Sequence, residues 1–255
     1  MDGLELSGKD NGDKNSGSPT RFRALTGPFR VIFLLCSVIG LLLAVHQILG
    51  LHSLTGLALL ENSYLYLLLA LYLSNVFLIF PATSKSARSH TPIYDVVLFI
   101  VCLSVGGYFS LTGLTSLQEG WEFISPTGPV VMAFVFWLII MEAARRTGGV
   151  AIAIIFGTFS LYPIFADMSF MPALLSGLSQ DIVSTASYHM MSEESVLGIP
   201  LRVFGTLIVG FILFGVALQS TGGGRFFINL AFAVLGGVRG GPAKVAIFAS
   251  GLFGS

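Results

Sequence analysis

The chain has 255 residues, of which 54% are hydrophobic and only 10% are charged. Soluble domains carry about 25% charged residues, so this composition excludes an ordinary globular protein with a water-exposed surface. The 13 Lys and Arg residues balance the 13 Asp and Glu residues, whereas a nucleic-acid-binding protein needs a basic excess to neutralise phosphates. The sequence therefore indicates a protein of the lipid bilayer with no nucleic-acid partner.

Residues 1–28 precede the first apolar run, and residues 1–20 are rich in Gly, Ser, Asn and Asp. Such a composition cannot bury a core and predicts a disordered cytoplasmic tail. A helix needs about 20 apolar residues to cross the hydrocarbon core of a membrane. Six stretches approach that length: 29–49, 60–80, 94–114, 128–145, 149–166 and 201–219. We predict an all-α polytopic membrane protein with about six transmembrane helices and the start of a further hairpin.

The gaps between these stretches alternate in basic content. Lys and Arg occur before the first stretch, at Lys85 and Arg88, at Arg145 and Arg146, and at Arg225. The intervening gaps, 50–59, 115–127 and 167–200, contain no Lys or Arg. Because cytoplasmic loops of membrane proteins collect Lys and Arg, we predict a cytoplasmic N-terminus and an outer location for the gaps without basic residues.

Single polar residues in the first three stretches have structural interpretations. Asp95 follows Pro92 at the start of the third stretch, where a negative charge suits the positive end of the helix dipole. His46 lacks further ligands at metal-binding spacing, so an interfacial or helix-contacting role is favoured over a metal site. For Asn75, a hydrogen bond to a neighbouring helix is favoured over contact with a substrate.

A charged cluster ends the fourth stretch. Glu142 lies three and four residues before Arg145 and Arg146, so on a helix the acid faces both bases. A carboxylate inside a membrane is a candidate for ion coupling. The position at the end of the stretch favours a helix-end ion pair anchored at the cytoplasmic surface instead.

The long gap 167–200 contains a further candidate helix. Residues 180–191 are predicted to form a short helix along the outer surface. Proline interrupts a helix, so the sixth stretch is expected to begin at or just before Pro200. Arg202 then lies in the first turn, where it can snorkel to the surface, pair with an acid such as Glu193, or contact an anionic substrate.

The C-terminal part of the chain is interrupted by glycine and proline. Residues 221–225 break one helix, an apolar run follows at 226–236, and Pro242 suits the first turn of a new helix. Short apolar segments interrupted in this way are typical of broken helices that bind ions or substrate in transporters, although an ordinary turn between two helices also fits. We assign a candidate substrate and ion region to Gly240, Gly241, Pro242, Ser250, Gly254 and Ser255.

Motifs for catalysis or resident metals are not found in the sequence. No serine is accompanied by a placed set of His and Asp partners. Neither a Cys/His cluster nor the metalloprotease pattern His-Glu-x-x-His occurs. We therefore expect no enzyme activity, no catalytic residue, no metal site and no organic cofactor.

Several segments together carry a resemblance to a known family. They include Glu-Ala-Ala-Arg-Arg-Thr-Gly-Gly at 142–149, Gly-Gly-Pro-Ala-Lys-Val-Ala at 240–246 and Ala-Ser-Gly-Leu-Phe-Gly-Ser at 249–255, with shorter matches at 197–201, 214–218 and 220–224. These segments resemble the fused permease subunit of TRAP (tripartite ATP-independent periplasmic) transporters, in particular the TAXI branch. The resemblance is dense over residues 140–255 and most specific over 240–255.

The resemblance implies a domain order. Residues 29–146 would form a four-span domain like the family's small subunit, and residues 147–166 a connecting transmembrane helix. Residues 167–199 would form an outer, periplasmic loop. Residues 200–255 would begin the large permease domain, so the chain resembles the truncated N-terminal part of a longer permease.

The resemblance also implies a function. Members of the family are secondary transporters of the bacterial inner membrane that use sodium as coupling ion. They import a small organic anion delivered by a periplasmic solute-binding protein, and their substrate and sodium sites lie in two helical hairpins. Residues 240–255 resemble the beginning of the first hairpin. The alternative is a non-transporting membrane scaffold or interaction subunit built from the four-span domain.

Overall fold

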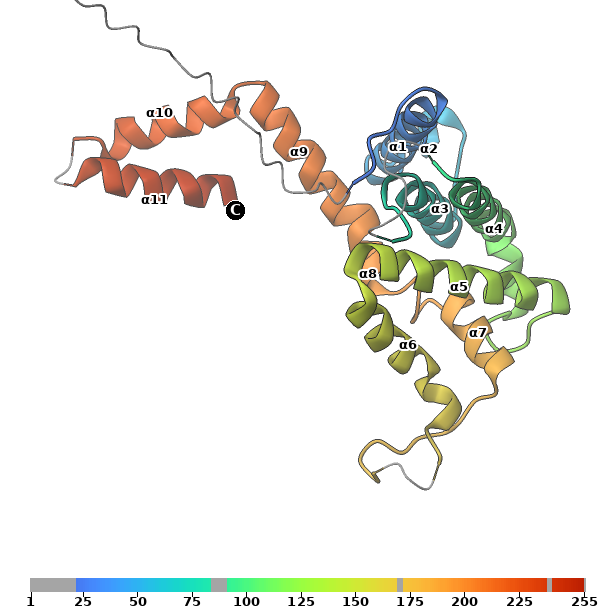
Figure 1. The fold of residues 1–255 in the computed structure, drawn as a ribbon. Coiled ribbons are helices and arrows are strands. Elements are labelled where there is room, and N and C mark those ends of the chain that lie inside the picture. Colours follow the sequence, from blue (N-terminus) through green and yellow to red (C-terminus); the bar gives the residue numbers. More distant parts are fainter. Residues whose placement is uncertain (1–21, 84–90, 169–171, 238–239, 255) are drawn as a thin grey trace, which may run out of the picture.

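The computed structural model describes residues 22–83, 91–168, 172–237 and 240–254, and within these ranges all regular structure is helical (Figure 1). The elements in chain order are α1 (Pro28–Ile48), α2 (His52–Thr55), α3 (Glu61–Ile79), α4 (Ile93–Glu119), α5 (Thr127–Gly148), α6 (Val150–Phe165), α7 (Ile182–Met191), α8 (Ile199–Val203), the π-helical turn η1 (Phe204–Ile208), α9 (Val209–Ser220), α10 (Gly223–Leu235) and α11 (Gly241–Gly254). The predicted all-α polytopic membrane fold is confirmed.

In the described part of the chain, five helices are long and apolar enough to cross a membrane. They are α1, α3, α4, α5 and the continuous helix Ile199–Ser220 that α8, η1 and α9 form together. The predicted stretch 149–166 forms α6, whose 16 residues are apolar but fewer than a typical span requires. Most of the predicted tail, and the loop with Lys85 and Arg88, lie outside the described residues.

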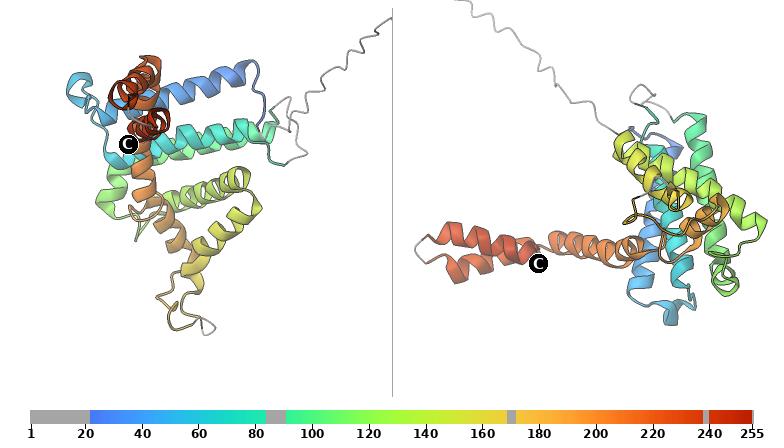
Figure 2. Two further views of the ribbon diagram at one scale, coloured as in Figure 1. Left: turned by 90° about the vertical axis from the view of Figure 1, so that its left-hand side faces the viewer. Right: turned by 90° about the horizontal axis from the view of Figure 1, so that it is seen from below.

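Helix α3 lies between α1 and α4 and is the most buried of the long helices (Figures 1 and 2). Small residues allow this close packing. A Cβ atom on Gly106 of α4 would lie 2.4 Å from the Cβ of Ala70, and one on Gly113 would lie 2.6 Å from the Oγ of Ser63. The two glycines are two helical turns apart and therefore share one face, as is typical of tightly packed membrane helices.

Polar and aromatic groups complete the core of the bundle. Tyr66 and Phe109 are almost fully buried and stack with their ring centroids 5.2 Å apart. Asn75 donates from Nδ2 to the Oγ of Ser37, 3.2 Å away, which confirms the hydrogen bond between helices that the sequence predicted. Bonds of this kind satisfy polar groups that cannot reach water.

The helix Ile199–Ser220 has the predicted extent but an unexpected direction. Figures 1 and 2 show that it runs across α1, α3 and α4 instead of alongside them. Its π-helical turn crosses α3, where the Oη of Tyr64 donates to the carbonyl oxygen of Gly205 at 2.6 Å. A Cβ on Gly205 would lie 3.0 Å from a side-chain carbon of Leu68. These contacts with α3 fix the crossing, and hydropathy along the chain carries no information on them.

Helices α10 and α11 form a hairpin that projects away from the bundle (Figures 1 and 2). Ala231, Val245 and Ala249 are buried between the two helices, with Leu235 packed against them. Large apolar side chains on the outside of this hairpin and on α9 are exposed, among them Phe214, Phe226 and Ile247. Apolar surface of this extent belongs against lipid or protein.

Candidate functional site

A buried network of charges lies at one end of the bundle, where α3 ends, α4 begins and α5 ends. Asp95 is fully buried in the first turn of α4. Its Oδ2 accepts from the Nη2 of Arg23 at 2.8 Å, and its Oδ1 accepts from the Nη1 of Arg146 at 2.6 Å. The two arginine side chains are 0% and 1% exposed. We call this the basic end of the bundle.

The predicted helix-end cluster is part of this network. Glu142 accepts from the Nε of Arg146 at 2.8 Å and from the Nε and Nη2 of Arg145, each at 2.7 Å. Arg145 also donates to the carbonyl oxygen of Ala82, 3.0 Å away. The cluster therefore ties α5 to the chain that follows α3, and both of its arginines are engaged by the protein itself.

The interpretation of Asp95 from the sequence, a negative charge at the positive end of a helix dipole, explains only part of what the structure shows. A place in the first helical turn accounts for its negative charge but not for its burial between two arginines. Arg23 lies 72 residues before Asp95, and Arg146 lies 51 residues after it. The sequence did place all three residues beside apolar stretches at the predicted cytoplasmic face. This placement alone does not predict that the three side chains contact one another.

The candidate substrate and ion residues lie where α11 begins and along it. Gly240, with φ +78°, immediately precedes the helix, and Gly241 and Pro242 are its first two residues. A Cβ on Gly241 would lie 2.5 Å from the carbonyl oxygen of Gly236, so the turn from α10 approaches the helix start closely. Ser250 is exposed on α11. Gly254 is the last residue of the helix, and Ser255 lies outside the described residues.

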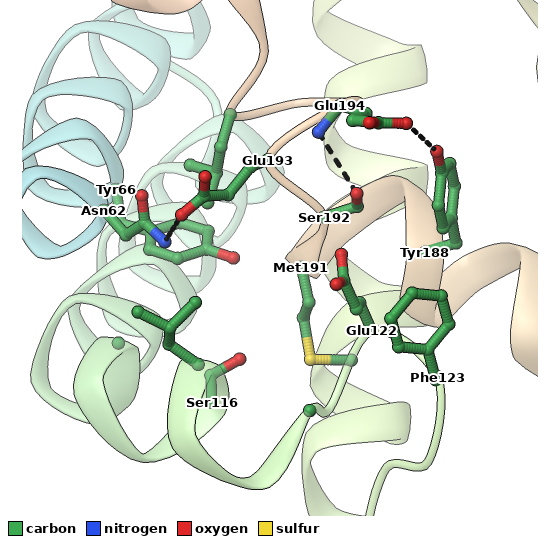
Figure 3. A pocket seen from close by; sticks show the side chains of 14 residues that line it. Asn62, Tyr66, Ser116, Glu122, Phe123, Tyr188, Met191, Ser192, Glu193 and Glu194 are labelled. Atoms are coloured by element: carbon green, nitrogen blue, oxygen red, sulfur yellow. Dashed lines mark hydrogen bonds between the residues drawn. The ribbon is translucent and has the colours of Figure 1, made fainter.

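The opposite end of the bundle carries acids and a pocket, and we call it the acidic end. The pocket has a volume of about 450 Å³ and lies among the N-terminal turns of α3, the C-terminal turns of α4, and α7 with the loop after it (Figure 3). Among the residues that line it are Asn62, Tyr66, Ser116, Glu122, Tyr188, Glu193 and Glu194. Residues of distant sequence segments thus form one cavity, lined by polar and apolar side chains alike.

Helix α7 is held in place beside the pocket by capping and by side-chain bonds. The Asp181 carboxylate accepts from the backbone N–H groups of Val183 and Ser184 and so caps the helix. The hydrogen bond from the Ser184 hydroxyl, with these backbone bonds, lowers the pKa of the Asp181 carboxyl. At the other end the ring nitrogens of His189 contact the carbonyl oxygen of Ser160 at 2.7 Å and the Oγ of Ser195 at 3.1 Å. The helix predicted within 180–191 is confirmed.

The three carboxylates of the pocket differ in their partners. Glu193 accepts from the Nδ2 of Asn62 and from the Nη2 of Arg202, both at 2.9 Å, and these bonds lower the pKa of its carboxyl. Among the described residues, the Glu194 carboxylate accepts from the neutral Oη of Tyr188 alone, at 3.1 Å. Glu122 forms no hydrogen bond or ion pair with any residue in the described ranges. Burial and the neighbouring Glu194 raise the pKa of the Tyr188 phenol.

Of the three roles that the sequence allows for Arg202, the structure shows the ion pair with an acid. It pairs with Glu193, as above, and its Nε also lies 3.6 Å from the Oε1 of Glu61. The arginine therefore joins the start of the crossing helix to the start of α3. It compensates Glu193 and leaves Glu122 and Glu194 without a cationic partner among the described residues.

Residues 135–255 match the model of the family described as Tripartite ATP-independent periplasmic transporter, DctM component. The match supports a TRAP transporter permease. It begins within α5 and continues through α11, so it includes α7 and the hairpin but not α3 or α4. The chain matches no curated protein and no solved structure.

Proposed function

We propose that the chain is part of the membrane permease of a sodium-coupled TRAP transporter of the TAXI branch. The proposed substrate is an organic anion delivered by a periplasmic binding protein, with the permease in the bacterial inner membrane beside the other TRAP subunits. The observation that carries the proposal is the DctM match over residues 135–255. The five long apolar helices support it, because a permease must be embedded in the bilayer.

The proposal assigns the basic end of the bundle to the cytoplasm and the acidic end to the periplasm. The positive-inside rule supports this, because Arg145 and Arg146 lie at one end and the gaps without basic residues lie at the other. Reporter fusions at residues 86 and 147 should be cytoplasmic, and fusions at residues 120 and 180 periplasmic. A cytoplasmic reporter at residue 180 would contradict the assigned topology.

Transport is tested in proteoliposomes that contain the chain and the loaded binding protein, with a panel of radiolabelled carboxylates. An inward sodium gradient should drive uptake, and replacing sodium with choline or omitting the binding protein should abolish it. Uptake that is independent of sodium would contradict the mechanism. If the chain co-purifies with a separate permease that transports equally well without it, the alternative scaffold function is correct.

The start of α11 is the proposed contact for the anion and the coupling ion. Free backbone N–H groups at a helix N-terminus attract negative charge, and the left-handed φ of Gly240 directs the chain into this helix. Gly240→Ala should therefore reduce uptake, because a side chain is strained at this φ. Gly237→Ala is the matched control, since a Cβ there meets nothing within 4 Å and φ is not positive. Equal effects of the two substitutions would argue against a specific role for this helix start.

A further inference from the structure

An apolar groove opens between α5 and α6. The two helices leave their shared turn in diverging directions, and α7 packs against both of them (Figures 1 and 2). The groove has a volume of about 290 Å³. It is lined mainly by apolar side chains, among them Trp137, Ile140, Phe156, Phe159, Met190 and Val196. The transport proposal assigns no role to this space.

The polar groups beside the groove are satisfied by one another. The Nε1 of Trp137 donates to the Oγ of Ser160 at 2.6 Å. The ring nitrogens of His189 contact the carbonyl oxygen of Ser160 and the Oγ of Ser195, as described above. The described residues that line the groove include no Lys, Arg, Asp or Glu. Because a polar or charged ligand is buried only at a cost unless it finds hydrogen bonds or opposite charge, this lining favours a hydrocarbon ligand.

The surface around the groove is apolar as well. Helix α6 has no buried residue, and its Ile155 and Phe159 are exposed. Leu138, which follows Trp137 on α5, is also exposed. A helix that is apolar on all sides is typical of a protein core or of the membrane, and α6 does not lie in the core. Since Phe159 both lines the groove and belongs to this outer surface, the groove continues the surface that faces the hydrocarbon of the bilayer.

The size of the groove distinguishes a lipid chain from a protein helix. One turn of an α-helix with its side chains is ~5.4 Å long and ~10 Å wide, which corresponds to roughly 400 Å³. The groove is smaller than this single turn, so a helix of another protein does not fit into it. A lipid chain is narrow and flexible. It can restore the contacts that the side chains along an empty groove lack on one side.

We propose that this groove binds one hydrocarbon chain of a membrane phospholipid. The chain enters between α5 and α6 and lies against Trp137, and the headgroup stays outside because the lining offers no charge. The bound chain stabilises the divergence of the two helices by filling the space between them. This proposal requires a bilayer around the protein but neither sodium coupling nor a binding protein, so it can be tested separately from transport.

The two tryptophans of the chain allow a direct test, because Trp137 lines the groove and Trp121 does not. In the Trp121→Phe variant of the full chain, Trp137 is the sole source of tryptophan fluorescence. This variant is titrated in detergent micelles with phosphatidylcholine that carries bromine, a contact quencher, on its acyl chains. Quenching should saturate as the lipid fraction rises, and unbrominated lipid should reverse it. Iodide, a quencher that stays in water, should have little effect once the lipid is bound.

Two matched substitutions separate the groove from the general lipid-facing surface. Val196→Phe adds volume inside the groove, whereas Val131→Phe adds the same side chain at an exposed position of α5 outside it. Displacing one methylene group of the bound chain should raise the lipid fraction at half-saturation about fourfold, and we expect at least this effect from Val196→Phe. Val131→Phe should change it by less than about twofold. Ile140→Phe also fills the groove, and it replaces Val196→Phe if circular dichroism shows that the latter fails to fold.

Four results would overturn the proposal. The first is the absence of saturable quenching of Trp137 by brominated lipid, and the second is an equal effect of Val196→Phe and Val131→Phe. The third is strong quenching by iodide at saturating lipid, which would show a water-filled groove. The fourth is loss of lipid quenching when the chain is reconstituted with the other proposed TRAP subunits, which would assign the groove to a protein partner. Loss of sodium-driven uptake with intact lipid quenching would refute the transport proposal alone.

Discussion

Replacement of Asp95 by asparagine tests whether the buried network holds the basic end of the bundle together. Asn keeps the size of the side chain but removes its charge, which leaves Arg23 and Arg146 buried without the carboxylate that both contact. Removing one partner of a buried ion pair costs about 3–5 kcal/mol. Arg146 keeps Glu142, and Arg23 keeps a bond to the carbonyl oxygen of Leu78, so we expect a loss near the lower limit, about 3 kcal/mol.

A competing account gives a different magnitude. If Asp95 acted only on the helix dipole, its loss would cost about 0.3–1 kcal/mol. The assay is reversible unfolding in mixed micelles with increasing SDS, followed by fluorescence of the two tryptophans, both of which are buried. A loss of about 3 kcal/mol corresponds to an unfolding constant raised by more than about a hundredfold.

Two controls test whether the lower free energy of unfolding of Asp95→Asn arises from the buried ion pairs. Asp167→Asn removes an exposed carboxylate that accepts from the Oγ of Ser179, and it should change the free energy of unfolding by less than about 0.5 kcal/mol. In a double-mutant cycle, Arg23→Gln combined with Asp95→Asn should cost at least about 1 kcal/mol less than the sum of the single changes. A loss below about 1 kcal/mol for Asp95→Asn, or strict additivity in the cycle, would refute the reasoning.

Two further predictions concern other parts of the fold. Gly106→Ala should destabilise the chain by about 1–3 kcal/mol, because the new Cβ clashes with Ala70. Gly107→Ala, where a Cβ meets nothing within 4 Å, should be neutral or stabilising in the same unfolding assay. Asp181→Ala should accelerate hydrogen exchange of the Val183 and Ser184 amides by removing the cap, whereas Asp181→Asn should preserve most of the protection. Because its folded-state pKa is lowered, this carboxylate stabilises α7 above its unfolded pKa of about 3.9. The protection factors of the two amides, which correct for the intrinsic pH dependence of exchange, should fall only as the pH falls through the folded pKa. Protection factors of these two amides that stay constant below pH 4 would contradict the capping role.

The extents of the helices could be predicted from the sequence because hydropathy and helix breakers are local properties. The stretch 29–49 corresponds to Pro28–Ile48, and the stretch 201–219 to Ile199–Ser220. The direction of the latter helix could not be predicted. It depends on the bond from Tyr64 to Gly205, which joins residues 141 positions apart.

Contacts between distant charges were likewise beyond the reach of the sequence. Spacing along one helix placed Glu142 beside Arg145 and Arg146, because three- and four-residue intervals fix the face. No spacing rule relates Arg23 to Asp95, or Glu122 to Glu194. The sequence did place the latter two acids in gaps of the same predicted face, but only the packing of α7 against the bundle brings them around one pocket.

The two ends of the bundle differ in how their charges are compensated. At the basic end, the carboxylates of Asp95 and Glu142 are each shared by two arginines, so both carboxylates are compensated by the described part of the chain itself. At the acidic end, Arg202 compensates Glu193, and the described part of the chain offers no cation to Glu122 or Glu194. The basic end therefore fixes the bundle through internal ion pairs, whereas at the acidic end ion pairing within the described residues reaches only Glu193.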